Sequence, residues 1–171
     1  MISSSELFST LLEGKPNSLG RVIEVYDSIT SGRISVIDLY NLYQFEDVSV
    51  SMRVSNILKR LWRDDPTNIL PLIDLFIEDA NKLSNPTFRW TIAQIVTELH
   101  DLMDIKQLKA MSLIIFDNLT ISQDWILLTQ SLKSCQLIIN NQIGTPDISI
   151  IEVLTKDSRN AVSSQALKVI K

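Results

Sequence analysis

The chain has 171 residues, a formal net charge of −4 and a hydrophobic content of 45%. This composition can bury a sizeable core and excludes an intrinsically disordered chain, and the length fits one domain over residues 1–171. The acidic balance argues against attraction of the whole surface to nucleic acid or to anionic lipid. The single cysteine, Cys135, excludes an intramolecular disulfide and any zinc site with several cysteine ligands.

From the sequence we expect neither a membrane-spanning segment nor a secretion leader. No window approaches about 18 uninterrupted apolar residues, and the first turns of the chain predict an amphipathic helix instead of a leader. One cysteine favours a reducing compartment. We therefore expect a cytoplasmic protein that does not enter a membrane.

The spacing of apolar residues predicts about ten helices and no sheet. In the first half of the chain we expect helices at residues 3–13, 18–30, 34–43, 46–63 and 71–83. In the second half we expect them at residues 86–100, 104–119, 122–140, 147–155 and 158–171. Residues 34–43 are rich in β-branched and aromatic side chains, so a strand is an alternative there. Asp38, Asn41 and the helical neighbours favour a helix.

The helix expected at residues 86–100 provides a template that recurs along the chain. Asn85 predicts an N-cap, and Pro86 lies in the first turn, where proline is tolerated. Apolar residues then stand at one helical stripe, which consists of Phe88, Ile92, Ile95, Val96 and Leu99. The same template fits helices anchored at Leu19, Val50, Leu127 and Val162. Together with Phe88, these residues give five anchors, separated successively by 31, 38, 39 and 35 residues. This spacing predicts a helical hairpin repeated about five times.

The segment Asn85-Pro86-Thr87-Phe88-Arg89, with the apolar residues that follow it, resembles the second helix of a HEAT repeat. Residues 46–50 and 125–127 are similar to the same pattern. The resemblance implies an all-α fold, a right-handed α-solenoid whose second helices line the concave side. The arginine that follows the anchor in the family occurs only at Arg89, so the ladder of polar contacts between repeats is expected to be mostly absent. HEAT-repeat proteins include scaffolds, transport receptors and DNA-repair glycosylases, so the resemblance selects no function.

Ten residues are candidates for contacting a partner. Most of them stand at offsets +2, +6, +9 or +13 from an anchor, which places them about 180° from the apolar stripe. Arg53 joins them because it opens the basic run of residues 53–63. The candidates are Met52, Arg53, Asn56, Lys59, Arg63, Trp90, Gln94, Thr97, Thr129 and Lys133. Trp90 offers the largest apolar area as a binding anchor, and packing between repeats is the alternative role for it.

These features favour a non-catalytic interaction module that binds a protein or peptide on the concave face, needs no cofactor, and is a monomer or weak dimer. Nucleic-acid binding or DNA-alkylation repair ranks second, because residues 53–63 could hold phosphates while Trp62 and Trp90 stack bases. A solvated helix face explains such a basic run more simply. His100 has no second ligand at metal-binding spacing, and Cys135 occupies an apolar template position, so neither predicts an enzyme.

Overall fold

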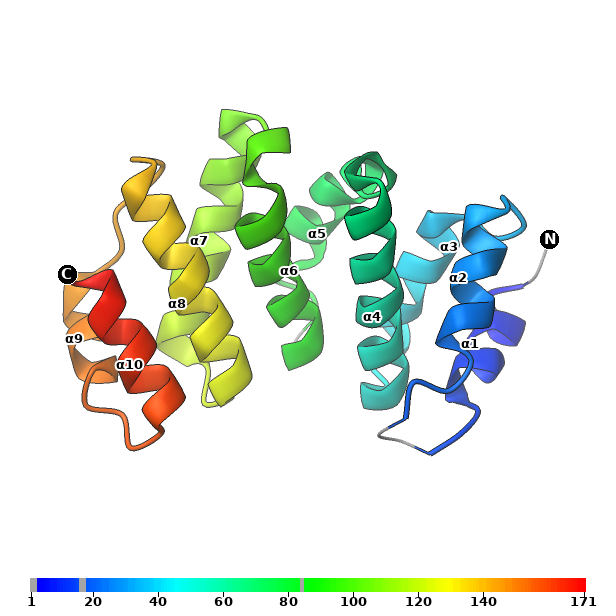
Figure 1. Cartoon of the computed structure of the whole chain (residues 1–171), viewed down its shortest axis with the longest axis horizontal. Coiled ribbons are helices and arrows are strands. Elements are labelled where there is room, and N and C mark those ends of the chain that lie inside the picture. Colours follow the sequence, from blue (N-terminus) through cyan, green and yellow to red (C-terminus); the bar gives the residue numbers. More distant parts are fainter. Residues whose placement is uncertain (1–2, 16–17, 84) are drawn as a thin grey trace. The chain divides into compact units, whose positions relative to one another are not determined.

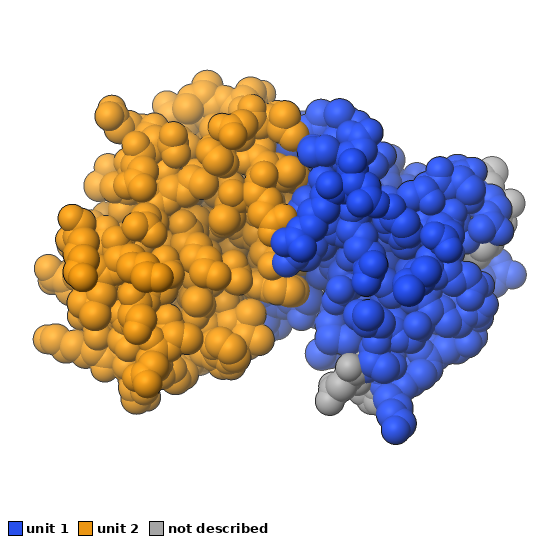
Figure 2. All heavy atoms as spheres, viewed as in Figure 1, with its two compact units in different colours: residues 1–88 blue, residues 89–171 orange. Residues whose placement is uncertain are grey.

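The computed structural model describes residues 3–15, 18–83 and 85–171. Within these ranges the chain forms ten α-helices and four short 3₁₀ helices, with no β-strand (Figure 1). The all-helical fold predicted from the apolar spacing is therefore confirmed. Residues 36–43 are helical, whereas residues 34 and 35 precede the helix, and neither part forms a strand. The chain divides into two compact units, residues 1–88 and 89–171 (Figure 2). None of the described helices has both the length and the apolar character needed to span a bilayer.

Unit 1 contains helices α1 to α5 and the start of α6. Its α-helices are α1 (Ser4–Leu12), α2 (Val22–Thr30), α3 (Val36–Asn41), α4 (Val48–Asp64) and α5 (Ile73–Asp79). Its 3₁₀ helices are η1 (Leu42–Phe45), η2 (Pro66–Asn68) and η3 (Leu70–Leu72). The division between the units falls inside α6 (Pro86–Leu99). Unit 2 then contains η4 (His100–Leu102), α7 (Ile105–Ile121), α8 (Trp125–Asn140), α9 (Ile148–Leu154) and α10 (Asn160–Val169).

Side-chain caps fix where α4, α6 and α8 begin, the three helices that carry the apolar template in the middle of the chain. The Oδ1 atom of Asp47 accepts a 2.9 Å hydrogen bond from the backbone N–H of Val50, and Asp124 Oδ1 accepts one of 2.7 Å from Leu127. Asn85 Oδ1 accepts a bond of 2.9 Å from the N–H two residues later. Each cap satisfies a backbone donor that has no partner within the first helical turn. Helices α4, α6 and α8 therefore start where their N-cap residues predict.

In the three middle repeats, the residues of the apolar template form the buried side of helices α4, α6 and α8. In α6 all five template residues are at most 4% exposed, and the corresponding residues of α4 are at most 1% exposed. In α8 the template positions are also buried, including those occupied by serine and Cys135. The template fails at the first anchor, because Leu19 lies before α2 and is 43% exposed. Helix α2 buries Val22 and Val25 instead. In the last repeat Val162 is buried, but Ile170 is 41% exposed.

Unit 1 is built around α4, against which α1 and α2 pack. An aromatic cluster of Tyr40, Tyr43, Phe76 and Phe88 supplies much of its core, with ring centroids 5.0 to 6.3 Å apart. Most of these rings meet edge to face, the arrangement that aromatic quadrupoles favour. The hydroxyl of Tyr43 lies 2.7 Å from Ser55 Oγ. The cluster thus fastens α3, η1, α5 and the start of α6 to α4.

Unit 2 packs two consecutive helical hairpins side by side. Helices α7 and α8 form the first hairpin and α9 and α10 the second, while α8 also packs on α10 and α7 on α9 (Figure 1). Helix α6 joins α8 through Ser134, whose Oγ donates to the carbonyl of Ala93 at 2.7 Å and lies 2.9 Å from Thr97 Oγ1. Arg89 pairs with Asp117 of α7 at 2.8 Å. The arginine that follows the HEAT anchor therefore makes a contact between helices at this one position.

Candidate interaction surface

The α4 part of the predicted surface consists of Met52, Asn56, Lys59 and Arg63. Successive members are three or four residues apart, so they lie along one face of the helix. Met52, Asn56 and Lys59 are half-buried, whereas Arg63 is exposed. These four residues belong to unit 1 and remain candidates for a partner contact.

Arg53 does not belong to this face, because its side chain is 0% exposed. Its guanidinium donates hydrogen bonds to the backbone carbonyls of Leu11, Lys15 and Ser18, at 2.8 Å for Lys15 and 3.1 Å for Ser18. The position explains the burial: three residues after Val50, Arg53 borders the apolar stripe of α4. Arg53 therefore fastens the connection between α1 and α2, and a partner at the surface cannot reach it.

The two tryptophans proposed to stack bases, Trp62 and Trp90, offer little accessible ring surface. Trp62 is 1% exposed, so neither face of its indole ring meets solvent. Trp90 is half-buried, and its indole nitrogen is buried. Stacking on aromatic faces supplies much of the affinity of proteins for single strands. The nucleic-acid hypothesis is left with the cationic residues near the end of α4.

Helix α6 presents less surface than its sequence predicts. Gln94 is 5% exposed, and every residue from Thr91 to Val96 is buried. Trp90 and Thr97 are half-buried. The offset rule assumes a helix with one buried side, whereas six consecutive buried residues cover the whole circumference of a helix. Gln94 is therefore an interior residue and does not contribute to an open face.

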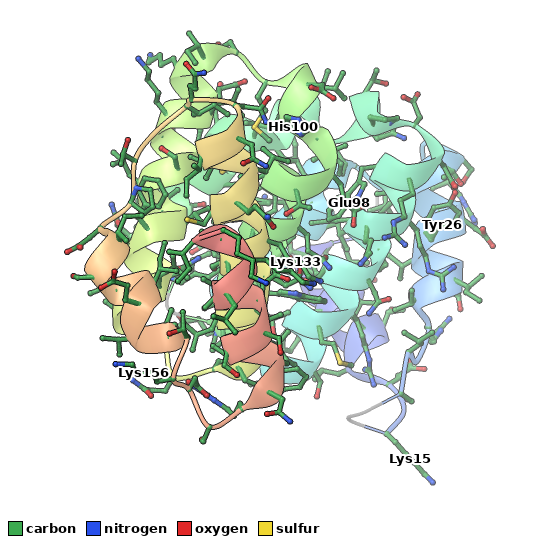
Figure 3. The ribbon with its side chains drawn as sticks, turned by 60° about the vertical axis from the view of Figure 1, so that its left-hand side comes forward. Lys15, Tyr26, Glu98, His100, Lys133 and Lys156 are labelled. Atoms are coloured by element: carbon green, nitrogen blue, oxygen red, sulfur yellow. The ribbon has the colours of Figure 1, made fainter. Side chains whose placement is uncertain are left out.

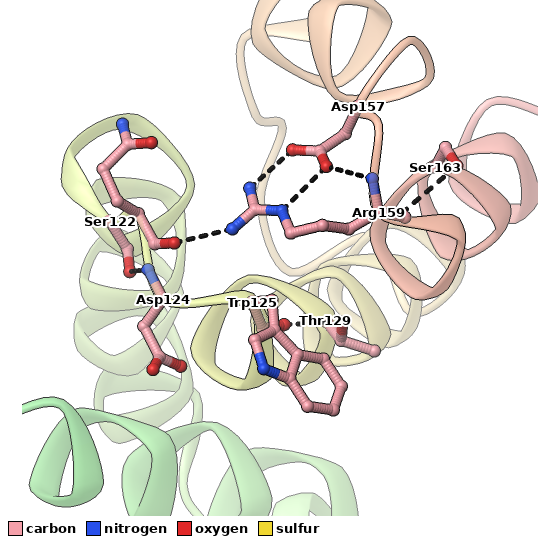
Figure 4. A network of polar contacts seen from close by, with 8 residues as sticks. Ser122, Asp124, Trp125, Thr129, Asp157, Arg159 and Ser163 are labelled. Carbon is pink, nitrogen blue, oxygen red and sulfur yellow. Dashed lines mark hydrogen bonds and ion pairs between the residues drawn. The ribbon is translucent and has the colours of Figure 1, made fainter.

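Helix α8 carries two residues of the predicted surface, Thr129 and Lys133. Thr129 is half-buried, and Lys133 is exposed (Figure 3). Trp125, the first residue of α8, is 50% exposed and precedes Thr129 by one turn, so that both lie on the same side of the helix. The hydroxyl of Thr129 donates a 2.7 Å bond to the carbonyl of Trp125 (Figure 4). We call Trp125, Thr129 and Lys133 the α8 face.

Sequence reasoning missed Trp125, because the template counts offsets forward from Leu127 and the tryptophan stands two residues before it. The signal was nevertheless present in the spacing. Trp125, Thr129 and Lys133 follow one another at intervals of four residues, which is the spacing of neighbours on a helix surface. The largest exposed aromatic side chain of this surface thus comes from α8, whereas Trp90 of α6 is more enclosed.

A second feature of unit 2 is an apolar groove between α7 and α9. One cavity of about 320 Å³ is lined by residues from the end of α7, from α8 and from α9. A neighbouring cavity of about 190 Å³ shares Leu119, Thr120 and Ile150 with it. We call the two together the α7–α9 groove. Its apolar lining consists of Phe116, Leu119, Leu128, Pro146, Ile150, Val153 and Leu154.

A polar network borders this groove. Arg159 Nη2 lies 2.6 Å from Asp157 Oδ2, Nε donates to Asp157 Oδ1 at 2.8 Å, and Nη1 donates to the carbonyl of Gln123 at 2.7 Å (Figure 4). Hydrogen bonds from Arg159 hold the pKa of the Asp157 carboxyl at about 2, well below its ordinary value. The network ties the α9–α10 connection to the α7–α8 connection.

His100 and Cys135 are the residues considered for metal binding or nucleophilic chemistry. Among the described residues, no three or more His, Cys, Asp or Glu side chains are placed to hold a metal ion. Burial raises the pKa of the Cys135 thiol to about 12, which leaves it a poor nucleophile at neutral pH. His100 (Figure 3) lies at the end of α6, and its Nε2 is 3.2 Å from Oδ1 of the next residue, Asp101.

Comparison of the chain with protein-family models, with curated proteins and with solved structures found no match. The likeness to HEAT repeats therefore rests on the sequence pattern and stays a prediction.

Proposed function

We propose that the chain is a non-catalytic interaction module that binds a protein or peptide. The observation that carries the proposal is the α8 face, on which Trp125 is 50% exposed beside Thr129 and Lys133. Tryptophan is enriched among the residues that dominate binding energies, because its ring buries a large apolar area at little entropic cost. Lys133 adds a cation that would favour an acidic group on the partner.

The same proposal includes the architecture expected from the HEAT resemblance. In unit 2 the hairpin α7–α8 packs on the hairpin α9–α10, which supports a stack of similar units. In such an arrangement α8 would be a second helix and its exposed face would belong to the concave side. We infer a cytoplasmic scaffold protein that acts as a monomer or weak dimer.

A photo-crosslinking experiment tests the α8 face. A photoreactive amino acid at position 133 of the full chain should crosslink the partner inside its native cells. Adding Trp125→Ala should reduce the crosslinked product at least about tenfold, as expected for loss of an aromatic hot spot. Ile126→Ala is the matched control, because Ile126 is 41% exposed but points about 100° away round the helix. Equal crosslinking by the two variants would contradict the proposal.

Nucleic-acid binding remains the competing function, and a gel-shift titration separates the two. Binding to single- or double-stranded DNA that weakens with salt and with Lys59→Ala and Arg63→Ala would favour it, since phosphate contacts release counterions. The burial of Trp62 argues for the opposite result. We expect no shift at physiological salt.

A further inference from the structure

We propose that the α7–α9 groove is a second binding site, which takes a short extended peptide with apolar side chains and at least one lysine or arginine. The proposal goes beyond the α8 face, because it concerns a different surface, between α7 and α9. Three features support it: the two adjoining cavities, the partly exposed apolar residues of their lining and the charges there.

The two cavities adjoin each other beside α9. Leu119, Thr120 and Ile150 belong to the linings of both, so the cavities are separated by no more than the width of these side chains. The seven residues of α9 extend over roughly 10 Å, which matches about three residues of an extended chain. Alternate side chains of an extended peptide point the same way and lie about 7 Å apart. Side chains at positions i and i+2 could therefore enter the two cavities.

The groove keeps apolar surface in contact with water. Val153, in its lining, is 71% exposed. Phe116, Ile150 and Leu154 of the lining are half-buried. Removing such surface from water is favourable in proportion to its area. A peptide with apolar side chains would gain affinity from these residues without any rearrangement of the core.

The charged residues of the lining favour a cationic peptide. They are Asp117, Asp147, Asp157 and Arg159, three acids and one base. Arg159 is already bonded to Asp157, and Asp117 is paired with Arg89. Asp147 is exposed, and its partners are the backbone N–H and hydroxyl of Ser149 in the first turn of α9. A lysine or arginine of the peptide is the complement to this excess of carboxylates, whereas an acidic peptide would be repelled.

A library of random heptapeptides displayed on phage, panned on the full chain, tests the inference. We expect enrichment of sequences that combine apolar residues with lysine or arginine. A labelled synthetic peptide of the enriched sequence is then titrated with wild type and variants by fluorescence anisotropy. An acidic consensus, or no enrichment at all, overturns the inference.

Two matched pairs of variants locate the binding. Val153→Ala should lower the affinity for the peptide about threefold or more. Its control is Leu113→Ala, because Leu113 is 69% exposed on α7 outside the groove, and this variant should change the affinity less than about 1.5-fold. Asp147→Asn keeps an N-cap and should also weaken binding about threefold, while Glu152→Gln removes the same charge from α9 outside the lining and should not. If the members of a pair behave alike, the groove is not the site. Trp125→Ala should leave this affinity unchanged, so failure here is distinct from failure of the α8 face.

Discussion

Replacing Arg53 by methionine tests whether a buried guanidinium holds the first two helices of unit 1 in place. Methionine keeps an unbranched apolar stem of similar length, so the packing of the aliphatic part is preserved while the hydrogen bonds are lost. The three bonds go to the carbonyls of Leu11, Lys15 and Ser18. The variant therefore reports on the bonds more than on the volume of the side chain.

The expected loss follows from the surroundings of each carbonyl. The bond to Leu11 is buried, and a buried bond from a charged donor contributes about 1.5–3 kcal/mol. The bonds to Lys15 and Ser18 are only partly buried, so water can replace the donor and about 0.5–1 kcal/mol is lost for each. Arg53→Met should thus lower the free energy of unfolding by about 2.5–5 kcal/mol. That is a large share of the stability of a typical domain.

Urea unfolding followed by far-UV circular dichroism measures the loss of unfolding free energy. The dependence of that free energy on urea concentration should be the same in all variants. Arg60→Met is the control, because Arg60 is exposed on the same helix and its replacement should change stability by less than about 0.5 kcal/mol. Arg53→Lys should recover little, since an ammonium cannot reach three carbonyls as a planar guanidinium does. If Arg53→Met unfolds like Arg60→Met, the bonds of the guanidinium are not needed and the reasoning is wrong.

Three further predictions concern other parts of the chain. Ile92→Ala and Leu58→Ala should each lower the free energy of unfolding by about 2–5 kcal/mol, measured by urea unfolding, because both side chains are 0% exposed. Cys135 should react with a thiol reagent at pH 8 only when unit 2 opens, since its thiol has a pKa of about 12 in the folded chain; rapid labelling of the folded protein would contradict this. The pKa of Asp157 is about 2 in the folded chain, lower than when unfolded, so its contribution to stability is present above about pH 4 and is lost as the pH falls toward 2. Asp157→Asn should therefore flatten the dependence of unfolding free energy on pH in that window, and an unchanged slope would argue against the pairing with Arg159.

The helices could be predicted from local chemistry, because their signals lie within one or two turns. Asp47, Asn85 and Asp124 cap the template helices as their residue types indicate, and a stripe of apolar residues at helical spacing becomes the buried side of α4, α6 and α8. Such signals need no knowledge of distant contacts. The helical assignment therefore follows from the sequence, while the stacking of all five hairpins into a solenoid stays a prediction.

The candidate surface was harder to predict, because the exposure of its residues depends on what packs against the side of each helix opposite the apolar stripe. Gln94 and Lys133 both stand at an offset of +6 from their anchors, yet Gln94 is buried and Lys133 is exposed. The offset from an anchor identifies one buried side only. It contains no information on whether the opposite side is also covered. For the same reason, the groove between α7 and α9 could not be read from either helix alone.

The first hairpin shows most clearly how a distant residue can override a local pattern. Leu19 fits the apolar template, but Gly20 beside it has a φ of +54°, a conformation that L-residues rarely adopt. A Cβ atom at Gly20 would lie 2.6 Å from the carbonyl oxygen of Glu13 and 3.1 Å from Cζ of Arg53. The turn therefore requires glycine because of its left-handed φ and the close Glu13 carbonyl, and the Arg53 guanidinium of α4 packs against the same turn. Helix α2 begins only afterwards, at Val22. Buried Arg53 and the turn before α2 thus meet across 33 residues of sequence, a contact that no spacing rule within a helix contains.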